Sequence, residues 1–304
     1  MRIGVAATPS VAIPTLDWLR DSQHDLSLVI TRPDRPAGRG RSLRESVVAK
    51  WASAHGVECV KPVASEELFE SLAFIDLVIT IGYGVILPIE ILSVPRFGFI
   101  NLHFSHLPSW RGAAPVQRAI LNGDQEFGVT VFALDSGMDT GPIYVQHDIR
   151  IEPYENAGEL LDRMAALGPE VIAQTLTMIE SGASATPQSK EAVSYAPKIS
   201  KEEARIVWNK NVIEVDRHIR AFTPDPGAWT SWRDSTLRID RARPFPFDHE
   251  LAAGFVNVQN GEVIVGCADG SALIIEEVTP AGKKAMSAKS WANGARIVNG
   301  ESFV

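Results

Sequence analysis

Three polar side chains in the first half of the chain combine an amide, an imidazole and a carboxylate. Asn101 and His103 flank Leu102 at the end of a short apolar run, and Asp139 lies in the glycine-rich segment 135–142. Side chains two residues apart on a strand point to the same face of the sheet. The set contains no serine or cysteine nucleophile, which favours acyl transfer between two nitrogen atoms.

In such a transfer an amine attacks a formamide-like carbonyl carbon, and negative charge develops on the carbonyl oxygen. The amide of Asn101 and a protonated His103 could both donate hydrogen bonds to that oxyanion. Asp139 would hold the imidazole and raise the pKa of His103, since a nearby negative charge stabilises imidazolium. The alternative is that these side chains only satisfy loop backbone groups. The residues alone leave both interpretations open.

The elements that must position these residues follow from an alternation of apolar runs and helical patterns. This alternation predicts a Rossmann-like α/β domain, a mostly parallel sheet with helices on both faces. The expected strands are residues 2–7, 26–31, 75–82, 98–101 and 128–135, and the expected helices include 47–56, ending on Gly56, and 156–182, interrupted near Gly168 and Pro169. Ligands of such sheets bind at the carboxyl ends of strands. We expect the strands before Asn101 and Asp139 to open on the same edge.

The pattern changes after residue 182. Residues 183–205 are small, polar and contain proline, so they predict a linker between a catalytic domain at 1–182 and a second domain at 206–304. In the second domain an expected helix at 212–222 precedes several short strands, separated by turn signals such as Asn260–Gly261. These strands predict a small β-barrel of the OB type, a platform that often binds nucleic acid.

The composition is that of an ordinary globular protein, with 304 residues, 45% hydrophobic and 22% charged. No run approaches the ~18 apolar residues of a membrane-spanning helix, and the first residues lack the apolar centre of a signal peptide. We therefore expect a cytoplasmic protein with no membrane partner. The net charge is −8, but residues 32–44 hold five arginines against one aspartate. A local basic loop of this kind can still bind a polyanion.

Two segments resemble the 10-formyltetrahydrofolate-dependent formyltransferases: INLHFSHLPSWRGAAPVQRAI at 100–120 and GVTVFALDSGMDTGPI at 128–143. The motif of that family reads Asn-x-His-x-Ser-Leu-Leu-Pro, followed by an Asp-Thr-Gly loop. Further similar segments are ATPSVAIPTLDWL (7–19), TRPDRPAGRGR (31–41), ISKEEARIVW (199–208) and PAGKKAM (280–286). The resemblance extends from residue 2 to about residue 296 and preserves the order of the motifs.

The resemblance implies that 10-formyltetrahydrofolate is the co-substrate, that no metal is used, and that the catalytic residues are Asn101, His103 and Asp139. It also implies a folate site formed by Ser105, His106, Leu107 and Pro108, with Thr140 and Gly141 in the loop that closes on the formyl group. Most members have leucine where this chain has His106, which places two histidines three residues apart. No third ligand accompanies them, so a metal pair is not expected.

Two nearby residues have open roles. Arg111 is expected either to contact an acidic substrate tail or to make a structural ion pair, and Tyr83 either to line the pocket or to pack as an ordinary aromatic residue. Tryptophans in the C-terminal region could stack on bases, although we expect most of them to pack in the core.

The resemblance is greatest to the members that formylate methionine on initiator tRNA, and it implies that acceptor, through direct attack by the α-amino group. An amino sugar nucleotide is the alternative acceptor, because some sugar-formylating relatives also carry a C-terminal domain. A third interpretation is a non-catalytic tRNA-binding protein, against which the intact trio argues. One chain with two domains and one bridging substrate makes a monomer sufficient.

The basic loop favours tRNA among these acceptors. Within the resemblance, Arg39 matches the acceptor-contacting arginine, and Arg35, Arg41 and Arg44 would assist it by contacting phosphates. Lys283 and Lys284 could extend this surface on the C-terminal barrel. The other interpretation is that these exposed charges only confer solubility.

Overall fold

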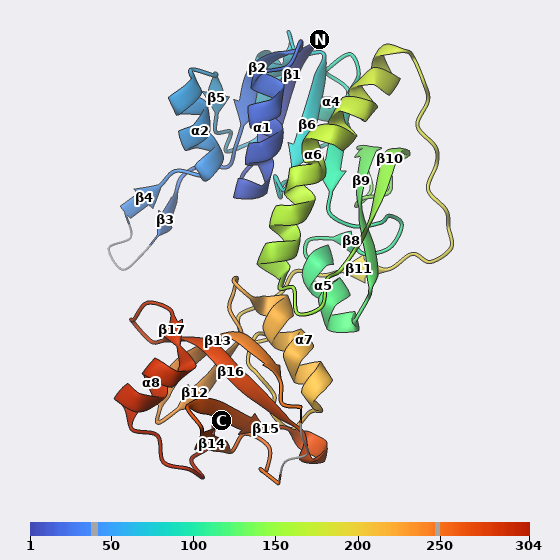
Figure 1. The fold of residues 1–304 in the computed structure, drawn as a ribbon. Coiled ribbons are helices and arrows are strands. Elements are labelled where there is room, and N and C mark those ends of the chain that lie inside the picture. The colour runs from blue at the N-terminus through green and yellow to red at the C-terminus, as the bar shows by residue number, and fades with distance from the viewer. Residues whose placement is uncertain (38–41, 247–249) are drawn as a thin grey trace. The chain divides into compact units, whose positions relative to one another are not determined.

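The computed structural model of the 304-residue chain describes residues 1–37, 42–246 and 250–304. The chain forms two compact units, each built from several segments (Figure 1). Unit 1 contains Met1–Pro115, Glu126–Arg150 and Leu161–Ala196, and unit 2 contains Val116–Gln125, Ile151–Leu160 and Pro197–Val304. Residues 183–196 of the expected linker thus cluster with unit 1.

A seven-stranded sheet forms the centre of unit 1, in the order β10-β9-β7-β6-β1-β2-β5. The strands from β7 to β5 are parallel, which confirms the mostly parallel α/β prediction. The order reverses beside β1, since β2 lies on one side of it and β6 on the other. The bounds are β1 Arg2–Ala7, β2 Asp25–Ile30, β5 Cys59–Val60, β6 Leu77–Ile81, β7 Phe99–His103, β9 Glu126–Ala133 and β10 Ile143–Arg150.

One strand runs against the expected direction. β9 is antiparallel to β7, with Ala133 opposite Ile100 and Thr130 opposite His103, and β10 returns antiparallel to β9. The expectation that β7 and β9 open on the same edge was therefore wrong. The chain then turns from β9 directly into β10. This connection needs no helical crossover, because β9 and β10 are antiparallel.

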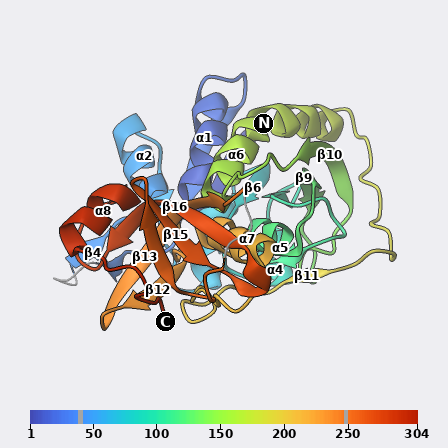
Figure 2. The same ribbon diagram turned by 60° about the horizontal axis from the view of Figure 1, so that its bottom comes forward.

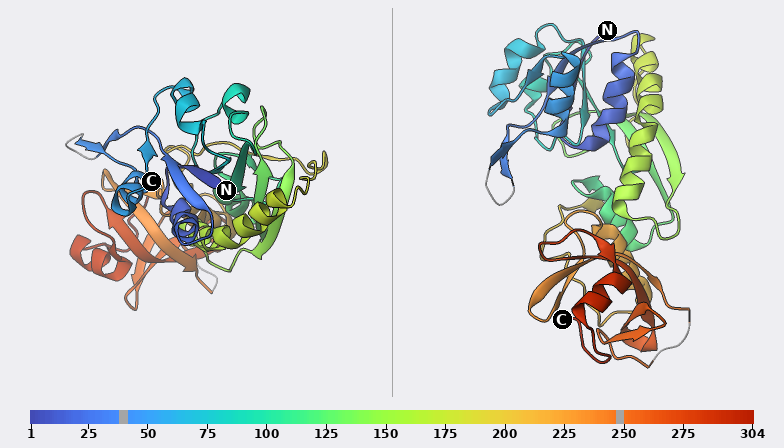
Figure 3. Two further views of the ribbon diagram at one scale, coloured as in Figure 1. Left: turned by 90° about the horizontal axis from the view of Figure 1, so that it is seen from above. Right: turned by 60° about the vertical axis from the view of Figure 1, so that its left-hand side comes forward.

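Helices cover both faces of this sheet: in Figure 3, α1 and α6 lie on one face and α3 and α4 on the other. Apolar residues of α3 and α4 share a buried cluster with Ala6, Leu28 and Val78 of the sheet. In α2, Ser46 caps the first turn through the Ala49 N–H, and Gly56 ends the helix at φ 67°, as predicted. The bounds are α1 Ile13–Arg20, α2 Val47–His55, α3 Leu68–Leu72, α4 Ile89–Leu92, α5 Pro115–Asn122 and α6 Ala157–Glu180, with 3₁₀ turns at Ser10–Ala12 and Ser65–Glu67.

Helix α6 is continuous, so the expected interruption near Gly168 and Pro169 was wrong. A Cβ at Gly168 would lie 2.5 Å from Thr15 Oγ1 and 3.0 Å from Leu102 Cδ2. The missing side chain lets α6 lie close against α1 and β7. This packing outweighs the one backbone donor that Pro169 removes.

Two short strand pairs complete unit 1. Strands β3 (Arg35–Ala37) and β4 (Ser42–Arg44) form an antiparallel hairpin. Strand β8 (Arg111–Gly112) pairs in parallel with β11 (Tyr195–Ala196), which comes from the segment expected to be a free linker.

Unit 2 holds an antiparallel sheet in the order β12-β13-β16-β15-β14, with β17 beside β16. Helix α7 packs against β13 and β16, and α8 against β15 and β16 (Figure 2). The predicted turn Asn260–Gly261 joins β14 to β15, with φ values of 52° and 81°. The bounds are α7 Val212–Phe222, β12 Trp229–Trp232, β13 Ser235–Pro244, β14 Val256–Gln259, β15 Glu262–Gly266, a 3₁₀ turn Ala268–Gly270, β16 Ala272–Pro280, β17 Met286–Ser287 and α8 Ala288–Ala295.

The C-terminal residues join the two edges of this sheet. Ser231 of β12 exchanges two backbone hydrogen bonds with Val304, while Val256 donates to Glu301 and Phe303 donates to Gly254. These bonds close the sheet as expected of a small barrel. Trp208 and Trp291 are buried in its core, whereas Trp229 and Trp232 are half-buried, so two of the four tryptophans pack there and not the expected majority. Within the described residues, no helix is both long and apolar enough to cross a bilayer.

Candidate active site

Strand β7 positions two members of the trio beside each other along one strand. His103 is its last residue, and Asn101 pairs in register with Thr80 of β6. His103 is only 8% exposed, whereas Asn101 is half-buried. Among the described residues, the Asn101 carboxamide finds no hydrogen-bond partner. Its N–H groups are therefore free to donate to a ligand.

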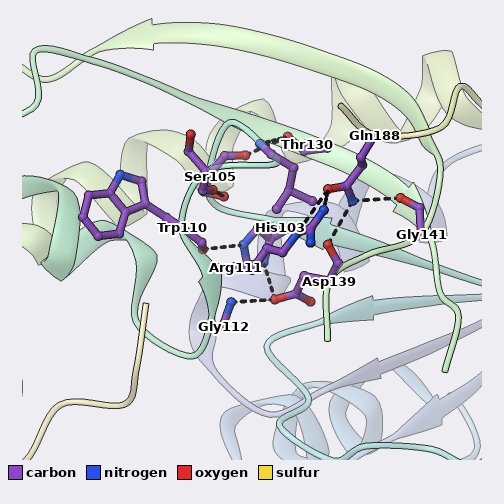
Figure 4. Close-up of polar contacts among 11 residues, drawn as sticks. His103, Ser105, Trp110, Arg111, Gly112, Thr130, Asp139, Gly141 and Gln188 are labelled. Carbon is purple, nitrogen blue, oxygen red and sulfur yellow. Dashed lines mark hydrogen bonds and ion pairs between the residues drawn. The ribbon is translucent and has the colours of Figure 1, made fainter. Parts of the chain in front are cut away.

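The third member reaches His103 through the loop 134–142. This loop leaves β9 beside Phe99, and it brings Asp139 Oδ2 to 4.0 Å from His103 Nδ1 (Figure 4). The Gly112 N–H donates to the same carboxylate oxygen at 2.7 Å. Asp139 itself adopts φ 54°, a left-handed conformation that aspartate tolerates better than most residues. The loop thus brings the Asp139 carboxylate close to the His103 imidazole, although β7 and β9 run in opposite directions.

The imidazole of His103 is held by a backbone carbonyl. Its Nε2 lies 3.3 Å from the Trp110 oxygen, and since a carbonyl can only accept, this contact places a proton on Nε2. Burial lowers the pKa of His103, and this outweighs the opposing effects of Asp139 and the Trp110 carbonyl. Asp139 thus raises the pKa of His103 as predicted, but the net pKa is lowered, because the ring is almost completely desolvated. Its resting form is neutral, with Nδ1 able to accept a proton.

The loop after β7 is folded by hydrogen bonds from β9 and β10. Thr130 donates to the Ser105 carbonyl at 2.7 Å, and Gln146 donates to the Leu107 carbonyl at 2.7 Å. Ser105 and Leu107 are buried at 0% and 1% exposure, and a cis peptide bond joins Leu107 to Pro108. The side chains of Ser105 and Leu107 consequently shape the loop from within, and Pro108 is half-buried.

His106 lies on the outer side of this loop. Its Nε2 is 3.0 Å from Asp148 Oδ1 of β10, and both side chains are largely exposed. No group of three or more histidine, cysteine or acidic residues that could hold a metal occurs among the described residues.

Asp135 fixes the shape of the loop that carries Asp139. Its Oδ1 accepts from the Thr140 hydroxyl at 2.7 Å and from the Gly137 N–H at 2.9 Å. At Gly141, a Cβ would lie 1.8 Å from the Ala133 carbonyl oxygen. The loop can therefore pass this point only with glycine.

We expect Gly141→Ala to lower the free energy of unfolding by about 3 kcal/mol, because the new methyl group must displace backbone rather than a flexible side chain. Urea denaturation measures the change. Gly294→Ala in α8 is the control: nothing lies within 4 Å of its Cβ position, so its effect should stay within about 1 kcal/mol. Equal effects of the two substitutions would contradict the close approach.

A glutamine from the expected linker joins the parts of this site. Gln188 Nε2 donates to the carbonyls of Asp139 at 2.9 Å and Gly141 at 2.8 Å, and its Oε1 accepts from the guanidinium of Arg111. Arg111 is thus buried against an amide, and among the described residues it does not make the ion pair that was one expectation for it. No sequence pattern points to Gln188, Thr130 or Gln146, since an isolated polar residue in a strand or a linker carries no signal of its long-range partner.

The arginine hairpin is built from β3 and β4. Arg35 and Arg44 lie opposite each other across the hairpin and are both exposed. Lys61 binds the two flanking carboxylates, Asp34 at 2.7 Å and Glu45 at 2.8 Å. Because Lys61 occupies these carboxylates, the arginines keep their positive charge available for an anion. Arg39 and Arg41 lie outside the described residues.

A cavity of about 340 Å³ adjoins the base of this hairpin, after the ends of β2, β5 and β6. Arg32, Arg35 and Tyr83 line it. Tyr83 is 5% exposed, so it both packs in the core and forms part of the cavity wall. Burial raises the pKa of its phenol.

The two predicted lysines of unit 2, Lys283 and Lys284, are exposed in the turn between β16 and β17. Lys283 also lines a cavity of about 470 Å³ whose wall includes Trp232 and Trp291. Arg233 stacks over the Trp232 ring at 4.2 Å, so a cation already covers one face of that aromatic group.

Comparisons with known proteins match this chain along most of its length. A family model described as "Formyl transferase" matches residues 1–176, and one described as "Formyl transferase, C-terminal domain" matches residues 198–296. Gln188 lies between the two matches. A methionyl-tRNA formyltransferase of Salinispora tropica is 43% identical over 306 residues, and the match covers 99% of each protein.

Two examples illustrate the solved structures that share this fold. One is an N-formyltransferase from Helicobacter canadensis, in complex with folinic acid and dTDP-3-aminofucose; its TM-score is 0.69 at 21% identity, over 90% of this chain and 98% of that one. The other is a methionyl-tRNA formyltransferase from Clostridium thermocellum, with a TM-score of 0.58 at 18% identity, over 91% and 99% of the two chains. At these identities, the likeness shows the fold alone.

Proposed function

The chain belongs to the formyl transferase family, and on that premise we propose that it transfers the formyl group of 10-formyltetrahydrofolate to the α-amino group of methionine on initiator tRNA. The observation that carries the proposal is the 43% identity to a methionyl-tRNA formyltransferase over 99% of both chains. The geometry of Asn101, His103 and Asp139 supports it, because these groups suit an acyl transfer without a covalent intermediate.

In the proposed reaction, the neutral methionyl amine attacks the formyl carbon, and the new N–C bond forms as the carbonyl oxygen becomes an oxyanion. The free amide of Asn101 donates to that oxygen. His103 accepts the proton of the attacking nitrogen at Nδ1, since its Nε2 proton is held by Trp110. Asp139, 4.0 Å from Nδ1, stabilises the imidazolium that results. The same proton then passes to N10 of the folate as its bond to the formyl carbon breaks.

For the folate we propose a site between the loop after β7, at Ser105, His106, Leu107 and Pro108, and the loop that carries Thr140 and Gly141. The buried side chains of the first loop make it a rigid wall, and Asp135 and Gln188 fix the second. The ligand would therefore meet backbone groups, the half-buried Pro108 and the exposed side chains of His106 and Thr140. We further propose that the protein works in the cytoplasm as a monomer.

For the acceptor we propose that the hairpin arginines bind tRNA phosphates. The cross-strand pair of Arg35 and Arg44 supports this, because two like charges opposite each other are unfavourable without an anion. Arg39 and Arg41 lie between these two arginines in the sequence, and we propose that they, and separately Lys283 and Lys284 of unit 2, also contact the tRNA.

A paired assay tests the acceptor. Purified protein with 10-formyltetrahydrofolate is given methionyl-initiator tRNA in one reaction and a dTDP-amino sugar in the other. We expect formylation of the tRNA. Formylation of the sugar nucleotide alone would establish the alternative acceptor.

We expect the double substitution Arg35→Ala/Arg44→Ala to raise the KM for tRNA and to reduce the salt dependence of binding by a slope of about 2, because each arginine is expected to neutralise one phosphate. Folate affinity should not change. Kinetics at several salt concentrations measure both effects. Arg96→Ala, which removes an exposed arginine beside Phe97, is the matched control and should leave the slope as it is. An equal loss of folate affinity would contradict this division of roles.

A further inference from the structure

We infer that Gln188 is a positioning residue for the formyl transfer, which holds the loop of Asp139 so that its carboxylate faces the His103 ring. The inference rests on the proposed function for its kinetic consequences. Gln188 contributes through hydrogen bonds to other protein groups, and each of these bonds lies within unit 1.

The Gln188 side-chain amide uses all of its hydrogen-bonding capacity within the protein. A side-chain amide has two N–H donors and an oxygen with two acceptor sites. Here the donors go to the carbonyls of Asp139 and Gly141, and the oxygen accepts from both Nε and Nη2 of Arg111. A group that uses its full hydrogen-bonding capacity is fixed in orientation, and it fixes its partners in return.

Gln188 contacts both partners of the hydrogen bond between the Gly112 N–H and the Asp139 carboxylate, through the Asp139 backbone and through Arg111. On one side, its donors bind the carbonyl oxygens of Asp139 and Gly141, so the backbone of Asp139 cannot rotate without breaking a bond. On the other side, its oxygen fixes Arg111, whose neighbour Gly112 donates to the Asp139 carboxylate at 2.7 Å. One side chain therefore sets the geometry between Asp139 and the strand that supports it.

The position of the Asp139 carboxylate affects the pKa of His103. The Asp139 carboxylate opposes the effect of burial and raises the pKa of His103. Because the interaction of two charges falls with distance, a displaced loop weakens this effect. Removing the Gln188 hydrogen bonds should then lower the pKa of His103 further and destabilise the imidazolium that forms during the transfer.

Backbone and side-chain hydrogen bonds anchor the segment that carries Gln188. Thr186 exchanges two backbone hydrogen bonds with Ile143, and β11 pairs with β8. Between them, the Ser194 hydroxyl accepts from the Trp110 N–H at 2.9 Å, next to the carbonyl that holds His103. Residues 186–196 are thus anchored to the rest of unit 1 along their length, and Gln188 links them to the Asp139 loop.

Two substitutions separate the roles of the Gln188 amide. Gln188→Met keeps the length of the side chain and removes every hydrogen bond. Gln188→Glu keeps an acceptor for Arg111 but points a carboxylate at two carbonyls. Both variants should lower kcat about tenfold, because the imidazolium that forms during the transfer loses part of its stabilisation by Asp139. Gln174→Met in α6 removes an exposed amide that bonds to Glu170; this variant is the control and should retain full activity.

The deciding readout is the titration of the His103 ring, followed by NMR in the protein without substrates and assigned with His103→Asn. We expect the His103 titration to move to lower pH in Gln188→Met and to stay in place in Gln174→Met. An unmoved titration, or full activity of Gln188→Glu, would overturn the inference. A merely structural role would lower activity only in proportion to unfolded protein. Failure of the proposed function would instead appear as wild-type protein that does not formylate the tRNA.

Discussion

Replacement of His103 by asparagine is expected to lower kcat about 10³-fold, within the range typical for loss of a general acid–base group. Asparagine can still donate to the Trp110 carbonyl, but it cannot accept and return a proton at the position of Nδ1. The KM for tRNA should change little, since His103 is buried and the proposed tRNA contacts lie on the arginine hairpin. Single-turnover formylation measures the chemical step directly.

The pH dependence gives a second measure of the same group. Because burial lowers the pKa of His103, the neutral base persists below the ordinary histidine value of ~6.5. Once the rate is divided by the fraction of methionyl amine that is neutral, activity should therefore stay constant as the pH falls through 6.5 and decline only at lower pH, where Nδ1 becomes protonated before the amine attacks. His147→Asn in β10 is the control, and it should leave kcat and this profile unchanged. A rate that still declines from above pH 6.5 after this correction for the amine would show that His103 is not the depressed base described here.

Replacement of Asn101 by alanine is expected to lower kcat by about 10²- to 10³-fold, the usual effect of removing one oxyanion donor. The Asn101 carboxamide has no protein partner among the described residues, so its removal breaks no hydrogen bond of the fold. The oxyanion exists only in the transition state, and for that reason the KM values should remain close to those of the wild type.

The control for Asn101→Ala is Asn122→Ala, at the end of α5, which removes an exposed carboxamide bonded to Asp124. Thermal unfolding of both variants should match the wild type. A large rise in the folate KM of Asn101→Ala, with kcat retained, would show that the amide binds the ground state and does not stabilise the oxyanion.

The sequence by itself determined the elements whose cause is local. Ser46 and Gly56 define the ends of α2 because a side-chain cap and a left-handed glycine act within one turn. Asn260 and Gly261 define a hairpin because both residues accept positive φ. The motif around Asn101, His103 and Asp139 identified the family through residue types and order, which need no coordinates.

Only the tertiary structure decided how these pieces combine. The direction of β9 depends on which neighbour it pairs with, and no pattern within residues 126–133 contains that information. The pKa of His103 depends on how much of the protein covers the ring, and burial reverses the sign that its neighbour Asp139 alone would produce. Gln188 lies 49 residues from Asp139, and a hydrogen bond over that separation exists only once the chain has folded. Local propensity and motif chemistry are short-range properties, whereas strand pairing, desolvation and long-range hydrogen bonds belong to the complete fold.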